Sequence, residues 1–205
     1  YIGFCFIITL ISIVVIWFLA AKLMPDKSMV GAFVQGSYRS SAAILGVAFI
    51  QNIYGTSGMA PLMIIGSVPL YNIFAVIILT FTSSDADKKG IRKACIGVLT
   101  NPIIIGIVLG MIASFFNIKF PGMVKKTISN MGVMTSPLAL ISIGATFRGR
   151  EALAKIKPTL GASFIKLIGL AAVFMPLAIY MGFRDQKLIA LLIMLASPCT
   201  PASYI

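Results

Sequence analysis

The sequence contains no histidine, five acidic residues and only three cysteines among its 205 residues. Without histidine, no imidazole can complete a zinc site, a Ser-His-Asp triad or a Cys-His pair. The cysteines, at positions 5, 95 and 199, lack metal-ligand spacing. No glycine-rich phosphate loop follows a strand-like segment. We therefore expect no metal site, no cofactor and no enzymatic activity.

Charged side chains are also scarce, at 11% of residues, whereas a soluble domain has roughly 25%. Hydrophobic residues make up 59% of the chain and its mean hydropathy is +1.03. They come in blocks of about 17 to 25 residues, the length that a helix needs to cross a bilayer. The alternating blocks of about ten residues that typify a membrane barrel are missing. The composition predicts an all-α, polytopic helical membrane protein.

Seven membrane segments are predicted, and the last of them is incomplete. They cover residues 2–21, 38–54, 60–82, 94–116, 127–147, 159–182 and 188–205. The chain begins without methionine and stops inside an apolar run, so we expect a fragment that is truncated at both ends. The polar stretch 83–93 predicts a cytoplasmic linker. It would separate the end of a first membrane repeat, residues 1–82, from a second membrane repeat, residues 94–205.

The 17 basic residues outnumber the acidic ones and give a net charge of +12. They lie in separate connections rather than on one face, which argues against nucleic-acid binding and favours positions that flank membrane helices. Eleven lie in the first, third and fifth connections, with Arg39 assigned to the first, and five lie in the others. The side with eleven should be cytoplasmic, so Tyr1 begins outside.

Residues 196–203, Ala-Ser-Pro-Cys-Thr-Pro-Ala-Ser, interrupt the last apolar segment. Pro198 and Pro201 remove two backbone donors and block the helical carbonyls behind them. Lipid offers these groups no partner, so such a break survives only when it is buried in protein or lines a wet cavity. In transporters, interrupted segments at matching positions of two halves indicate an inverted repeat with its substrate site at the breaks. The unusually short segment 38–54 is the counterpart in the first half.

Lys166 is the only basic residue placed deep inside a predicted segment. An ammonium there costs roughly 2.5–3.5 kcal/mol on insertion, so it should face the helix bundle or a wet cavity. Snorkelling to the interface near Pro158 is the alternative, and the sequence leaves both open. All five acidic residues fall in connections, so the predicted segments hold no carboxylate for a sodium or proton site.

Polar residues and prolines also interrupt other segments, for example at Asn101-Pro102 and Ser136-Pro137. A single hydroxyl more often bonds back to its own helix. As a set over several segments, these residues predict a polar cavity. Positive helix ends and a nearby lysine would favour an anionic ligand there.

These motifs resemble the auxin efflux carrier family of permeases, which includes plant auxin carriers and bacterial malonate and malate permeases. The resemblance covers nearly the whole chain and rests on five stretches. They are Val34–Gly46 with Asn52–Gly55, Asn101–Gly110, Ser136–Ala145, Lys166-Leu167 and Ala196–Tyr204. It implies two inverted five-helix repeats, with this chain covering helices three to nine. The fourth and ninth helices would be broken, cross near the midplane and form the substrate site.

The resemblance also assigns candidate substrate-binding residues. They are Ser41, Gly46, Asn101, Ser136, Lys166, Ser197, Pro198, Thr200 and Pro201. In the fourth helix the family's Arg-Ser-Asn reads Arg39-Ser40-Ser41, and its proline is replaced by Ala48. Substrate contact is therefore expected mainly in the second half. A different substrate or an inactive copy would each account for the departure.

The predicted function is a secondary transporter, a permease or efflux carrier that moves a small organic anion by alternating access. A dicarboxylate and an auxin-like acid are both candidates for that anion. The alternatives are a sodium- or proton-coupled symporter or a channel-like protein on the same fold, and a membrane sensor without transport. The expected partners are the anion, the lipid bilayer and, as an open alternative, a second copy in a homodimer. The expected location is the cell inner (plasma) membrane, in multi-pass form.

Overall fold

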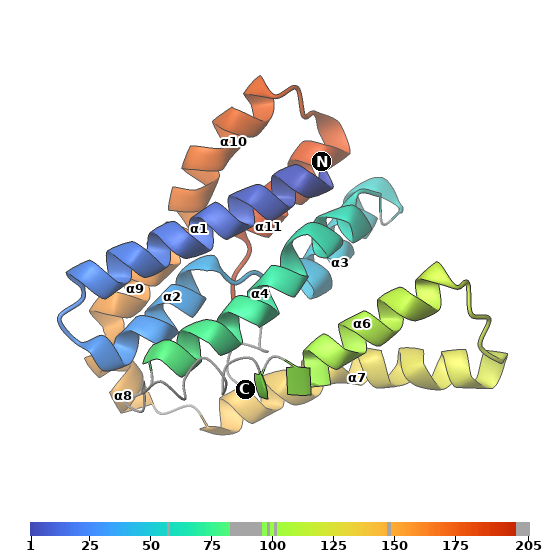
Figure 1. The fold of residues 1–205 in the computed structure, drawn as a ribbon, viewed down its shortest axis with the longest axis horizontal. Coiled ribbons are helices and arrows are strands. Elements are labelled where there is room, and N and C mark those ends of the chain that lie inside the picture. Colours follow the sequence, from blue (N-terminus) through green and yellow to red (C-terminus); the bar gives the residue numbers. More distant parts are fainter. Residues whose placement is uncertain (57, 83–95, 98, 101, 147–148, 200–205) are drawn as a thin grey trace.

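The computed structural model describes residues 1–56, 58–82, 96–97, 99–100, 102–146 and 149–199. Over these ranges the chain is helical and contains no strand (Figure 1). The α-helices are α1 Ile2–Leu23, α2 Val30–Tyr38, α3 Val47–Tyr54, α4 Ala60–Thr82, α6 Pro102–Phe115, α7 Gly122–Thr146, α8 Gly149–Ala154, α9 Ile156–Phe164, α10 Leu170–Tyr180 and α11 Asp185–Ala196. Three short turns complete them: the 3-10 turn η1 Lys27–Met29 and the π-helical turns η2 Ala42–Gly46 and η3 Ile165–Gly169.

Three helical stretches within the described residues are long and apolar enough to cross a membrane. They are Ile2–Leu23, Ala60–Leu79 and Ile156–Tyr180. They correspond to the first, third and sixth predicted segments, and the third stretch joins α9, η3 and α10 into one continuous helix. The prediction of a polytopic, all-α membrane protein is confirmed.

The core forms where α1 and α4 run side by side, with α2, α10 and α11 packed around them (Figure 1). α1 is apolar on all sides, as expected of a membrane helix. It buries Cys5, Ile8 and Ile13 against the bundle and leaves Phe18 exposed. Gly66 of α4 allows the close approach, because an added Cβ there would lie 2.9 Å from the carbonyl oxygen of Ile2.

The second predicted segment, 38–54, contains a break near its start, as the resemblance to a family with a broken fourth helix implied, but its predicted bounds miss the helix before the break. α2 begins at Val30 and ends at Tyr38, residues 39–41 are not helical, and helical structure resumes at Ala42. This break contains no proline, and α3 runs straight through Ala48. No proline therefore forces this interruption.

The helix of the last predicted segment ends where the prolines predicted an interruption. α11 ends at Ala196, and Ser197 has extended backbone with φ −84° and ψ 151°. The chain beyond Cys199 and the predicted linker 83–93 lie outside the described residues. α6 and α7 form a hairpin that projects from the rest of the bundle in Figure 1.

Candidate functional site

The two helix breaks meet in the interior of the bundle. The backbone N–H of Ser41 donates to the carbonyl oxygen of Pro198 at 2.9 Å. The residues that precede them in the two segments, Ser40 and Ser197, are joined by a hydrogen bond of 2.5 Å between their hydroxyl oxygens. All four residues come from segments that have left the helix, so each break supplies partners for backbone groups that the other exposes. This contact explains how the first helix stays open without a proline.

We call the contact between residues 39–41 and residues 197–198 the crossing. Lys166 lies at the crossing and is almost completely buried, with 2% of its surface exposed. Its Nζ donates to the carbonyl oxygen of Tyr38 at 3.2 Å and to that of Met194 at 3.0 Å. The side chain therefore does not snorkel to the membrane interface. It projects from the π-helical turn η3, a kind of irregularity that often marks functional sites.

The two carbonyls that Lys166 contacts belong to the ends of the two interrupted helices. Tyr38 is the last residue of α2, and Met194 lies in the last turn of α11. Each helix C-terminus carries roughly half a negative elementary charge on carbonyls without intrahelical partners. One ammonium group therefore faces two negative helix ends, and the electrostatics hold both ends at the same point.

A second buried cation, Arg39, was wrongly assigned to a connection. Only 4% of its surface is exposed, and it follows directly after α2. Its guanidinium donates to Gln35 Oε1 at 3.0 Å and to Asn72 Oδ1 at 3.2 Å, while its Nε has no hydrogen-bond partner. With Arg39 removed, the predicted cytoplasmic side retains ten basic residues against five. The sequence held two signals that Arg39 is buried among polar partners. They are Gln35, four residues before Arg39, and Asn72, a polar residue within an apolar helix.

The charges at the crossing are unbalanced in the described part of the chain. Its buried polar side chains include the two cations and no carboxylate. Lys166 faces helix ends, whereas Arg39 is held by neutral amide oxygens. Neither cation has a buried acidic partner among the described residues.

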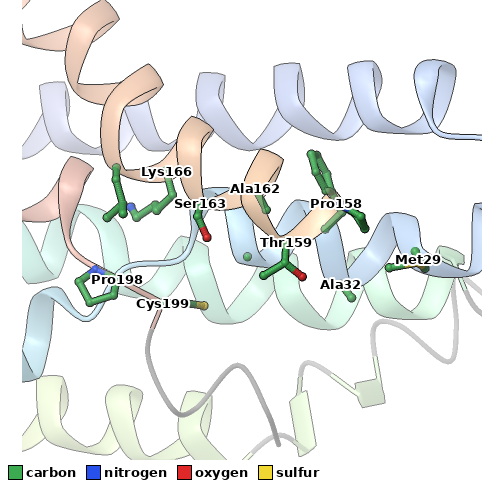
Figure 2. Close-up of a pocket in the computed structure, with 12 residues that line it drawn as sticks. Met29, Ala32, Pro158, Thr159, Ala162, Ser163, Lys166, Pro198 and Cys199 are labelled. Atoms are coloured by element: carbon green, nitrogen blue, oxygen red, sulfur yellow. The ribbon is translucent and has the colours of Figure 1, made fainter. Parts of the chain in front are cut away.

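A cavity of about 310 Å³ lies between α2 and the helix formed by α9 and η3. Lys166, Pro198 and Cys199 line one end of it, and Met29 and Pro158 line the other (Figure 2). Thr159 and Ser163 are exposed along its side. The rest of the lining is apolar, with Ala32, Phe33, Gly36, Ala162 and Leu167. The volume falls within the range of small-molecule sites.

An ion pair marks the end of this cavity away from Lys166. Asp26, in the connection before α2, lies 3.5 Å from Lys155, in the connection before α9. Both side chains are about half exposed. Hydrogen bonds from Ser28 are the main reason that the pKa of Asp26 lies below its ordinary value. The carboxylate is therefore ionised and bridges the two connections nearest to Met29 and Pro158.

The structure brings together five of the candidate residues predicted from the sequence. Ser41, Ser197, Pro198 and Lys166 form the crossing itself. Gly46 ends η2 beside it, and a Cβ there would lie 3.3 Å from side-chain atoms of Ile193 and Met63.

The other four candidates lie elsewhere or are not described. Ser136 lies in α7, outside the elements that form the crossing, and the interruption predicted at Ser136-Pro137 is wrong, because α7 continues through Pro137. Asn101, Thr200 and Pro201 lie outside the described residues.

Ser40 and Cys199 were not among the candidates. The hydroxyl of Ser40 bonds across the crossing, and the thiol of Cys199 lines the cavity 4.0 Å from the carbonyl oxygen of Gln35. The sequence alone did not indicate either contact, because both depend on how residues 197–199 pack against α2 and the residues that follow it.

The fold and the site define a class of protein: a polytopic helical membrane protein in which two helix interruptions meet beside a buried lysine and a cavity. Residues 2–204 match the family of membrane transport proteins, the auxin efflux carrier family of permeases. The chain belongs to that family, whose members are transporters rather than enzymes. No curated protein and no solved structure matches the chain.

Asn72→Ala should destabilise the protein by about 1.5–3 kcal/mol, because the substitution removes an acceptor from a buried guanidinium. Asn52→Ala is the matched control, since its exposed amide bonds only to its own helix, at Ala48. Thermal unfolding of the purified protein would measure both. Equal melting temperatures for the two variants would show that Asn72 does not stabilise the buried charge of Arg39.

Proposed function

We propose that the protein is a secondary transporter for a small organic anion, and that the anion binds with its negative group at the Lys166 end of the 310 Å³ cavity. The observation that carries this proposal is the pair of buried cations at the crossing, without a buried carboxylate in the described residues. Membership of the membrane transport protein family supports the broader class. A cationic substrate would find no counter-charge at this site.

The lining of the cavity narrows the choice of anion. Only the Lys166 end and the side with Thr159 and Ser163 are polar, and the remaining surface is apolar. A monocarboxylate with an apolar body would place its carboxylate near Lys166 and its body against Phe33 and Leu167. A short dicarboxylate would leave its second carboxylate among apolar side chains, which costs several kcal/mol. We therefore favour an amphipathic monocarboxylate over a dicarboxylate.

The orientation of the cavity suits an inward-open state. Met29 and Pro158 line the end that lies beside the connections with the excess of basic residues, which the charge asymmetry predicts to be cytoplasmic. Lys166 and the crossing close the opposite end. Alternating access then requires the crossing region to move against its surroundings, so that the site opens to the other side. A plasma-membrane location is the expected setting.

The driving force can be the membrane potential alone. An inside-negative potential favours the exit of an anion by about 2.3 kcal/mol per charge per 100 mV. The described residues supply no carboxylate at the crossing to hold a sodium ion or a proton. The site therefore fits an efflux carrier that needs no coupling ion.

Vesicles containing the full-length protein should show saturable flux of aromatic monocarboxylates toward the positive side. Lys166→Gln should lower kcat/KM roughly tenfold or more, because a charge-assisted hydrogen bond contributes about 1.5–3 kcal/mol. Lys187→Gln, at an exposed position on α11, is the matched control. Flux that does not saturate would indicate a channel, and binding without flux would indicate a sensor. Equal kinetics of Lys166→Gln and wild type would remove Lys166 from the substrate site.

Ala32→Phe should block transport without unfolding the protein, because Ala32 is exposed and its side chain faces the cavity. The added ring would occupy part of the volume that the apolar body of the substrate needs. Ala172→Phe makes the same change at an exposed position on α10 away from the cavity and should retain flux. Radiolabelled uptake measured together with the melting temperature separates blockage from misfolding. Normal uptake by Ala32→Phe would show that the substrate does not use this cavity.

A further inference from the structure

We infer that one water molecule is bound inside the bundle, where it bridges the hydroxyl of Thr9 on α1 and the ammonium group of Lys166. The site is a second, much smaller cavity of about 10 Å³. The inference goes beyond the proposed anion transport, because it concerns a solvent site that joins α1 to the crossing and not the molecule that crosses the membrane.

The small cavity lies in the interior of the bundle and has polar walls. The eight described residues that line it are all buried, and they come from six different helical elements. Five of the eight carry a polar side chain: Thr9, Ser12, Tyr38, Tyr71 and Lys166. Cavities that stay empty in proteins have apolar walls, whereas polar cavities of sufficient size hold water. The lining therefore favours a hydrated site.

The hydroxyl of Thr9 is the first group in this cavity that needs a partner. Only 4% of Thr9 is exposed, and its Oγ1 has no hydrogen-bond partner in the described part of the chain. The side chain of Tyr71 lies close enough to interact with Thr9, but not in hydrogen-bond geometry. A buried hydroxyl without a partner is costly, and native proteins usually satisfy such groups with protein atoms or ordered water.

Lys166 supplies the second partner of the water. An ammonium group has three N–H donors, and Nζ uses two of them on the carbonyl oxygens of Tyr38 and Met194. Among the described residues, no acceptor takes the third. Tyr38 and Met194 also line the small cavity, which places Nζ beside it. A water molecule there can accept the third N–H and donate to Thr9 Oγ1, so that one ligand satisfies two buried groups.

The size and the charge of the cavity select water over other small ligands. Its volume is about the minimum that one water molecule needs, and a halide ion is larger. The ammonium group in its wall repels a metal cation. A neutral ligand on this side leaves the positive charge of Lys166 in place for the proposed anion, which would approach through the larger cavity.

The substitution Thr9→Val distinguishes a hydrated cavity from an empty one by the sign of its effect. With water bound, it removes one partner of the water and weakens the link to Lys166, so the melting temperature should fall by roughly 2–4 °C. In an empty cavity it would replace an unpartnered hydroxyl with a methyl group of similar shape, and the melting temperature would stay the same or rise.

Thr82→Val is the matched control. It makes the same chemical change on α4, where the hydroxyl of Thr82 donates to the carbonyl oxygen of Ile78 in its own helix at 2.7 Å. Thr82 does not line the small cavity. Its variant should therefore melt close to the temperature of the wild type.

An experimental structure of the full-length wild-type protein, at a resolution that shows ordered water, is the direct measurement. It should show one water molecule within hydrogen-bond distance of both Thr9 Oγ1 and Lys166 Nζ. Two results would overturn the inference. One is a Thr9→Val protein that melts at or above the wild-type temperature. The other is a map that shows other internal waters and leaves this cavity empty.

The map requires no variant, so it decides the question even if Thr9→Val does not fold. Neither measurement involves flux. An empty cavity would therefore leave the proposed anion transport untouched, and an absence of flux would leave the water site untouched.

Discussion

A single ammonium group placed between two helix ends is the constraint on which the rest of the structure depends. Interrupted helices in a membrane expose carbonyls for which lipid offers no partner. The donation from Lys166 to Tyr38 and Met194 satisfies carbonyls of both helices and balances their partial charge. The serine pair and the backbone bond from Ser41 to Pro198 satisfy the neighbouring groups. Without the lysine, the two negative helix ends would repel each other at the centre of the bundle.

The same arrangement accounts for the proposed choice of substrate. Lys166 and Arg39 are both buried, and the buried polar side chains of the described residues include no carboxylate beside them. Lys166 lines one end of the cavity, where the proposed anion would place its negative group. The apolar walls would then favour an anion that carries a hydrophobic body. In the proposed function, Lys166 both stabilises the crossing and binds the substrate.

The second break could be predicted from the sequence because Pro198 and Pro201, only three residues apart, remove two backbone donors within about one turn. The sequence placed Lys166 inside an apolar segment but left open whether it snorkels, and only its contacts with Tyr38 and Met194 decide that it is buried. The first break was implied only by the family resemblance, because Arg39-Ser40-Ser41 contains nothing that forbids a helix. Pro198, 157 residues after Ser41, accepts its N–H, and a contact over such a distance leaves no local signal. Arg39 was misassigned for the same reason: its neutral acceptors lie partly on α4.

Cross-linking the two breaks is the most direct measurement of whether they meet. Ser40→Cys and Ser197→Cys would be combined in a protein whose Cys5, Cys95 and Cys199 are replaced by alanine. Because the two hydroxyl oxygens lie 2.5 Å apart, these cysteines should form a disulfide rapidly under mild oxidation. The control pair combines Ser37→Cys with Ser197→Cys. Ser37 lies in α2, about one helical turn before Ser40, so this pair should form a disulfide much more slowly. Equal reaction of both pairs, or no disulfide at all, would contradict the crossing.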